Sequence, residues 1–125
     1  MDFLKGLPMS EKTYTVLFVD DDRDVLDMYS ALLENSNYRI FRAASGTEAV
    51  TMMDQHQFDC IITDLKMPDG NGLKVRDAAM EREIPLIIVT GYQGSYKTIL
   101  DAKDVVLEKP VRRQDLINTI EKIAS

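Results

Sequence analysis

The chain is poor in the residues that form covalent cross-links or histidine-based sites. It contains one cysteine, Cys60, and one histidine, His56, among 125 residues. A single cysteine cannot form an internal disulfide, and its place in the apolar run CIIT favours a small buried side chain over a reactive thiol. His56 lies in the polar run DQHQF, so we expect it to be exposed and without a chemical role. A disulfide-stabilised fold is therefore excluded.

Long apolar runs and an excess of basic residues are also lacking. No apolar run approaches the ~20 residues that a membrane helix requires, and the first twelve residues lack the apolar stretch and cleavage site of a signal peptide. The 21 Asp and Glu outnumber the 15 Lys and Arg, which gives a formal net charge of −6. Phosphate backbones bind a concentrated basic surface, and the basic residues here are scattered. We therefore expect a cytoplasmic protein in which this domain binds neither nucleic acid nor membrane.

Short apolar runs alternate with amphipathic segments along most of the chain. The runs predict five strands, at residues 14–19, 38–44, 60–63, 85–90 and 104–108. Helical spacing of apolar residues predicts helices at 24–35, 48–55, 73–81, 95–102 and 116–123, with Ser45 and Glu48 as a capping box before the second. Such alternation favours an α/β fold with a doubly wound, five-stranded parallel sheet. We assign residues 14–125 to this domain and residues 1–13 to an N-terminal extension.

Acidic residues follow two of the predicted strands. In an open parallel sheet, ligands bind beyond the carboxyl ends of the strands, where the winding direction reverses. A strand order of 2-1-3-4-5 makes the first and third strands neighbours, so Asp20 and Asp21 would meet Asp64. Like charges raise one another's pKa unless a cation lies between them. The pattern predicts Mg²⁺, a hard ion that a few carboxylates and waters hold.

The remaining strand ends supply groups that suit phosphoryl transfer. Asp64 is the candidate nucleophile, because a carboxylate whose charge is partly offset by a metal can attack phosphorus and become an acyl phosphate. Such a transfer needs positioning and charge neutralisation, for which Thr90 offers a hydroxyl and Lys109 an ammonium. The turn KMPDGNG can bring the backbone carbonyl of Lys66 to the metal. The bond between Lys109 and Pro110 is a candidate cis peptide that would aim the lysine inward.

Four motifs carry a family resemblance. In order along the chain they are VLFVDDDRD, DCIITDLKMPDGNG, IIVTGY and LEKPV. Together they resemble the receiver domain of two-component response regulators, and the similarity extends from Thr15 to Ala124. The resemblance implies a flavodoxin-like (βα)5 fold, with residues 14–125 as the receiver domain.

The resemblance also implies roles for the site residues. Asp64 would accept a phosphoryl group from a histidine kinase or a histidine phosphotransfer protein. Asp20 and Asp21 would arrange Mg²⁺, with Asp21 and Asp64 as direct ligands, while Thr90 and Lys109 would contact the phosphoryl group. The domain would be a signalling switch and not an enzyme, since it catalyses only its own phosphorylation and dephosphorylation. It would regulate a downstream protein that the sequence does not identify, and homodimer formation stays open.

Two departures from the family pattern are visible. Val106 stands three residues before Lys109, where the family usually has an aromatic residue. The interval from Thr90 to Lys109 is short by roughly one helical turn, which predicts a shortened fourth helix at 95–102. These departures keep open an alternative, in which a degenerate receiver binds partners without being phosphorylated.

Two unrelated sites share features with the run DDDRD. A phosphatase of the haloacid dehalogenase type would use Asp20 and Asp22, but Asp24 occupies the place of its Thr or Val. A calcium loop would use the same three acids, but Val25 replaces its required glycine and Ala31 its terminal glutamate. Both are rejected on these residues, and we expect Asp22 to cap the first helix.

Overall fold

The computed structural model describes residues 13–34, 37–65, 72–91 and 104–124. The predicted helix at 95–102 and the carbonyl of Lys66 lie outside these ranges, as does the N-terminal extension except for Thr13. The shortened fourth helix, the contribution of Lys66 and the extension therefore stay predictions.

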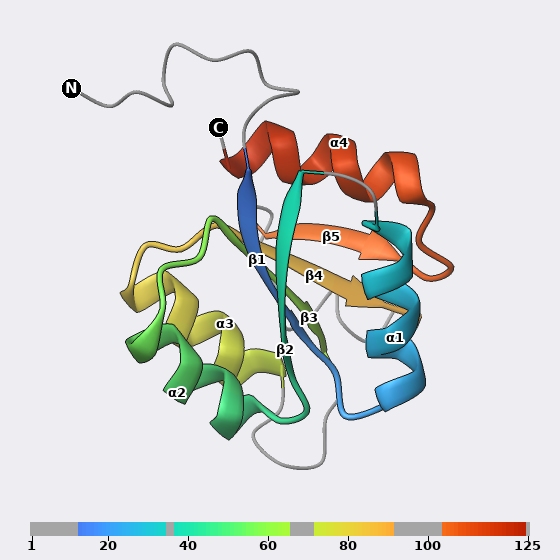
Figure 1. Ribbon diagram of the computed structural model, residues 1–125. Coiled ribbons are helices and arrows are strands. Elements are labelled where there is room, and N and C mark those ends of the chain that lie inside the picture. Colours follow the sequence, from blue (N-terminus) through green and yellow to red (C-terminus); the bar gives the residue numbers. More distant parts are fainter. Residues whose placement is uncertain (1–12, 35–36, 66–71, 92–103, 125) are drawn as a thin grey trace, which may run out of the picture.

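Five parallel strands form one sheet in the order β2-β1-β3-β4-β5 (Figure 1). The strands are β1 (Tyr14–Val19), β2 (Tyr38–Ala43), β3 (Cys60–Asp64), β4 (Leu86–Thr90) and β5 (Val105–Glu108). The helices in the described part are α1 (Arg23–Leu32), α2 (Gly46–Gln55), α3 (Gly72–Glu81) and α4 (Arg113–Ala124). The predicted doubly wound α/β sheet and its strand order are confirmed, and α4 is the last of the predicted helices.

Both faces of the sheet are covered by helices. Figure 1 shows α1 and α4 on one side of the sheet and α2 and α3 on the other. Along β1, Val16 and Phe18 pack toward α1 and α4, whereas Leu17 and Val19 pack toward α2 and α3. Side chains of a strand alternate between its two faces. A central strand with a helical layer on each face must therefore be apolar at successive positions, which explains the run VLFV.

Side chains cap two helices where the sequence predicts caps. The side chain of Asp22 accepts a hydrogen bond from the backbone N–H of Asp24 at 2.9 Å, and Ser45 accepts one from Glu48 at 3.1 Å. α1, however, ends at Leu32, three residues before the predicted end at residue 35. Leu33 has φ −100° and ψ 3° and is buried, so the chain leaves helical geometry while this side chain still packs in the core.

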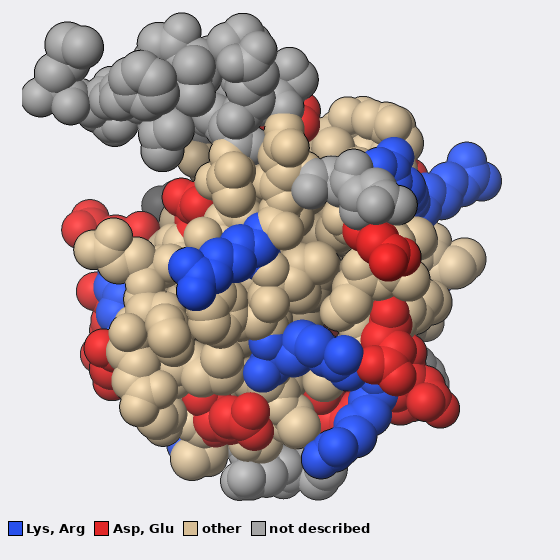
Figure 2. Space-filling view, viewed as in Figure 1, with Lys and Arg blue, Asp and Glu red and all other residues tan. Residues whose placement is uncertain are grey.

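The structure also bears on the predictions for Cys60, for His56 and for the surface charge. Cys60 is fully buried and His56 is exposed, as expected. On the face drawn in Figure 2, basic and acidic side chains are interspersed. Within the described ranges, no helix has the length and apolar character needed to cross a membrane.

Candidate functional site

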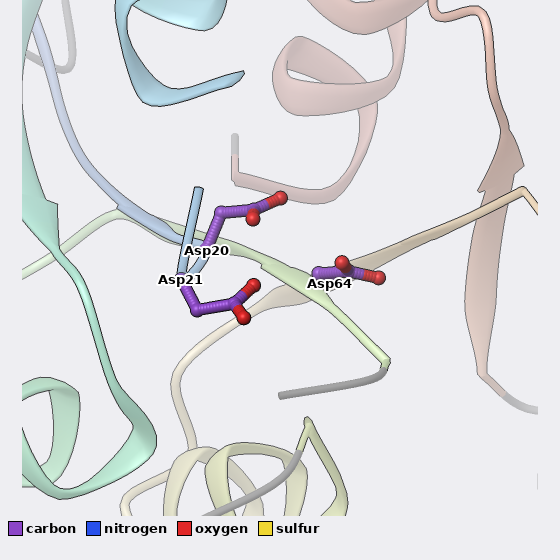
Figure 3. Close-up of side chains that lie close together, drawn as sticks. All are labelled: Asp20, Asp21 and Asp64. Atoms are coloured by element: carbon purple, nitrogen blue, oxygen red, sulfur yellow. The ribbon is translucent and has the colours of Figure 1, made fainter. Parts of the chain in front are cut away.

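Three carboxylates converge at the carboxyl edge of the sheet. β1 and β3 are neighbours, and Val19 is paired with Thr63, so Asp20 and Asp64 are the next residues on adjacent strands. Asp21 follows directly, and Figure 3 shows the three side chains grouped at these strand ends. One carboxylate oxygen from each residue lies within 4.8 Å of those of the other two. The predicted meeting of Asp20, Asp21 and Asp64 is therefore observed.

Asp20 is the most deeply buried of the three acids, with 2% of its surface exposed. Its Oδ1 accepts a hydrogen bond from the backbone N–H of Asp22 at 2.9 Å, whereas its buried Oδ2 has no hydrogen-bond partner in the described part of the chain. Burial is the main cause that raises the pKa of this carboxyl from 3.8 to about 6. The charges of Asp64 and Asp21 raise the pKa further, while the Asp22 N–H and Lys109 lower it. Asp20 is thus a carboxylate whose ionisation is opposed by its surroundings.

Lys109 supplies a positive charge to this cluster. Its Nζ lies 3.5 Å from Oδ2 of Asp64 and 3.8 Å from Oδ2 of Asp20. The bond between Lys109 and Pro110 is cis, as predicted. The backbone N–H of Lys109 donates to the carbonyl of Thr90 at 2.9 Å, which joins the ends of β5 and β4.

Thr90 is the last residue of β4, on the strand next to Asp64. The register pairs Asp64 with Val89, so Thr90 lies one residue further toward the carboxyl edge, where it is 3% exposed. Gly91 follows and is exposed; a Cβ added there would lie 3.7 Å from Cδ of Lys109, an ordinary contact distance. Asp64 and Thr90 therefore end β3 and β4, and Lys109 directly follows β5 at the same edge.

Two residues hold the backbone around Asp64: Thr63, which the sequence did not single out, and Gly72, which was predicted only as part of the turn KMPDGNG. Thr63 donates its hydroxyl to the carbonyl of Asp64 at 2.9 Å. Gly72 begins α3 and donates its N–H to the carbonyl of Leu65 at 3.0 Å. A Cβ at Gly72 would collide with the carbonyl oxygen of Asp64 and lie 2.6 Å from Cα of Leu65. Its place at the start of a predicted helix, in the motif DGNG, was the available signal.

The donor set fits a hard divalent cation. Three carboxylates offer oxygen atoms as ligands, and Oδ2 of Asp20 is a buried acceptor that receives no hydrogen bond from the described residues. Carboxylates and water are the ligands that Mg²⁺ takes in proteins. A cation would also offset the mutual repulsion of these acids. The cluster could therefore hold such a metal.

Comparison with known families decides the class of protein. Residues 16–121 match the model of the response regulator receiver domain. The chain belongs to this family. Receiver domains are parts of two-component systems, in which they interact with histidine kinases or phosphotransfer proteins and with downstream partners. The resemblance seen in the four motifs is thus confirmed at the level of the family.

Named relatives and a solved structure agree with this assignment. Regulatory protein VanR of Enterococcus faecium is 30% identical over 120 residues, which cover 90% of this chain but 49% of VanR. The polar-differentiation response regulator DivK of Brucella ovis is 30% identical over 116 residues, which cover 87% of this chain and 94% of DivK. The crystal structure of a CheY-like receiver domain protein from Methanospirillum hungatei superposes with a TM-score of 0.80 at 28% identity and covers 90% of this chain and 94% of that one. The chain spans about half of VanR and nearly all of DivK.

Proposed function

We propose that this receiver domain is a phosphorylation-dependent signalling switch in which Asp64 accepts the phosphoryl group. The observation that carries the proposal is the convergence of three carboxylates and the ammonium of Lys109 at one edge of the sheet, in a chain of this family. Asp20, Asp21 and Asp64 would hold Mg²⁺, with the backbone carbonyl of Lys66, which lies outside the described residues, as a further ligand. Bound Mg²⁺ would supply positive charge to the phosphoryl oxygens during transfer.

The reaction is an exchange of one bond at phosphorus. A carboxylate oxygen of Asp64 attacks the phosphorus of a phosphohistidine on the donor protein, and the new O–P bond forms as the N–P bond breaks. The electron pair of the N–P bond stays on the imidazole nitrogen, which takes up a proton from solvent. The product is an acyl phosphate on Asp64 and a free histidine on the donor.

Two other side chains stabilise the transferred group. The ammonium of Lys109, 3.5 Å from Asp64, is placed to bond a phosphoryl oxygen as charge develops on it. Thr90 ends the adjacent strand and can present its hydroxyl to a second oxygen. Water later attacks the phosphorus, which releases inorganic phosphate and restores the carboxylate. The domain thus catalyses only its own modification and its own reset.

The partners follow from this chemistry. The phosphoryl donor is a histidine kinase or a histidine phosphotransfer protein in the cytoplasm, and the output is a downstream protein or a further domain. VanR is about twice as long as the matched region, whereas DivK is matched over nearly its whole length. The relatives thus include one protein that extends well beyond the matched region and one that does not. The downstream target and homodimer formation stay open in this proposal.

A degenerate receiver is the second candidate function, and Val106 favours it. This residue lies in β5 paired with Ile88, at the position that carries an aromatic ring in most of the family. A valine has no ring to move when the site is phosphorylated. In this alternative the domain binds its partner with the same affinity before and after exposure to a phosphodonor.

Intact-mass measurement after incubation with acetyl phosphate tests the proposal. Wild-type protein with Mg²⁺ should gain the mass of one phosphoryl group, and Asp64→Asn should gain none. Chelation of Mg²⁺ should abolish the gain in wild type. Absence of a gain in wild type would reject phosphorylation and leave the degenerate receiver. An unchanged gain in Asp64→Asn would instead reject Asp64 as the acceptor and place the phosphoryl group on another residue.

A further inference from the structure

Two buried oxygens near the acidic edge have no hydrogen-bond partner among the described residues. One is Oδ2 of Asp20 and the other is the hydroxyl of Tyr29 in α1. Both residues are 2% exposed. A buried hydroxyl without a partner is costly, and a phenylalanine would fill the same space without that cost. The hydroxyl of Tyr29 therefore calls for an explanation that packing alone does not give.

The position of Tyr29 in α1 directs its side chain toward the acids. α1 begins at Arg23, directly after the acidic run, and Tyr29 lies six residues further, about 9 Å along the helix axis. Helical side chains lean toward the N-terminus of their helix. The ring of Tyr29 thus leans back toward the edge of the sheet that carries Asp20.

A contact with β1 also directs the ring of Tyr29 toward Asp20. The ring of Tyr29 stacks on that of Phe18, with centroids 5.0 Å apart and planes 10° apart. Phe18 and Asp20 are two residues apart, so their side chains project to the same face of the strand. A ring that stacks on Phe18 and leans toward the helix start therefore has its hydroxyl on the Asp20 side.

Electrostatics agrees with this geometry. Burial raises the pKa of the Tyr29 hydroxyl, and the two charges that raise it further are those of Asp20 and Asp64. The buried hydroxyl of Tyr38, by contrast, has Glu121 as the first charge that raises its pKa. Among these tyrosines, Tyr29 is the one whose hydroxyl is coupled to the acidic site.

We propose that Tyr29 is a positioning residue of the acidic site, whose hydroxyl donates to Oδ2 of Asp20 through one bridging water. The link is through water because no direct hydrogen bond joins the two oxygens. The N–H of Asp22 already holds Oδ1 of Asp20, and Lys109 lies 3.8 Å from Oδ2. With Tyr29, both oxygens of this carboxylate are oriented before the cation arrives. This role rests on the proposed function, because it concerns Mg²⁺ binding at that site.

Calorimetric titration with Mg²⁺ of wild type, Tyr29→Phe and Tyr38→Phe tests the role. The two variants each remove one buried tyrosine hydroxyl and keep the ring, so both should fold. We expect Tyr29→Phe to weaken Mg²⁺ binding about three- to tenfold, the factor that corresponds to one hydrogen bond. Tyr38→Phe, at the opposite end of the sheet, should change the affinity by less than about twofold.

A spectroscopic readout separates positioning from a general loss of structure. Mg²⁺ should perturb the near-ultraviolet tyrosine spectrum of wild type and of Tyr38→Phe, and most of this change should be missing in Tyr29→Phe. Equal Mg²⁺ affinities in wild type and Tyr29→Phe would overturn the role of Tyr29, as would an equal loss in both variants. A wild type that binds no Mg²⁺ would instead overturn the metal site of the proposed function, and this role with it.

Discussion

At the scale of single residues, Asp20 combines deep burial with a charge that its neighbours oppose. Its pKa in the fold, about 6, lies above the usual 3.8, so the folded carboxyl holds its proton more tightly than the unfolded one. Below pH 3.8 both states are protonated, so the contribution of this group to stability is fully present and does not change with pH. As the pH rises from about 4 through 6, the metal-free fold loses the stability that the proton provided. The site is therefore least stable where it is fully ionised.

Asp20→Asn should stabilise the metal-free protein near neutral pH. The amide keeps the hydrogen bond from the Asp22 N–H and removes the buried charge, so we expect the free energy of unfolding to rise by about 1–2 kcal/mol near pH 7. Near pH 4 the gain should vanish. Urea unfolding with chelator at both pH values measures this, with exposed Asp24→Asn as the control. A gain of equal size at both pH values would contradict the raised pKa.

The roles of Tyr29 and Gly72 could not be predicted from the sequence. Helical spacing identifies Tyr29 as a core residue but gives no direction for its hydroxyl, which depends on the stacking with Phe18. Gly72 is visible as a glycine in a turn motif, but its contact with the backbone of Asp64 and Leu65 depends on how closely α3 approaches β3. The residue types at the strand ends were sufficient to predict that Asp20, Asp21 and Asp64 meet, because parallel strands bring their carboxyl ends to one edge of the sheet.

At the scale of elements, the start of α3 is packed directly on the end of β3. Gly72→Ala places a Cβ against the carbonyl of Asp64 and Cα of Leu65, neither of which can move without displacing the strand end. We expect a loss of about 1–3 kcal/mol in the free energy of unfolding. Gly91→Ala is the matched control, because its Cβ would meet only the side chain of Lys109, and its effect should be within about 0.5 kcal/mol. Similar effects in the two variants, measured by urea unfolding, would contradict the close approach.

A second link joins α3 to the start of β5. Arg76 Nε lies 3.0 Å from Oδ1 of Asp104, and the two side chains are 13% and 10% exposed. Asp104→Asn removes the nearer carboxylate beside the mostly buried guanidinium of Arg76 and leaves that of exposed Asp77, 3.8 Å from Nη1, so we expect a loss of about 2–4 kcal/mol. The exposed pair of Arg42 and Asp27, 2.6 Å apart, offers the comparison, since Asp27→Asn should lose less than about 1 kcal/mol. Thermal unfolding of both variants checks this order, and equal losses would contradict it.

Element boundaries were predicted well where apolar runs are uniform and less well at helix ends. The bounds of β1 were predicted to the residue, because both faces of that strand are covered and its run is apolar except for Thr15. The end of α1 was placed three residues too late, since Leu33 keeps the apolar spacing although its backbone is no longer helical. Apolar spacing reports burial, and burial continues beyond the helix at this point.

At the scale of the whole molecule, the order of strands turns separate motifs into one site. Asp20, Asp64, Thr90 and Lys109 are spread over 90 positions of the chain, and the order β2-β1-β3-β4-β5 places all four at neighbouring strand ends. The alternation of strands and helices predicted the parallel sheet, and the site was predicted on the condition that its strand order is 2-1-3-4-5, which the structure shows. Val106, by contrast, marks a departure from the family pattern that the order of strands does not explain.

The identity of the phosphorylated residue tests the central claim most directly. Wild-type protein treated with acetyl phosphate and Mg²⁺ can be reduced with borohydride, which converts an acyl phosphate to an alcohol, and then digested and sequenced by mass spectrometry. The account predicts homoserine in place of Asp64 and unmodified aspartate at Asp20 and Asp21. Reduction at either of those two residues, or unmodified aspartate at all three, would contradict it.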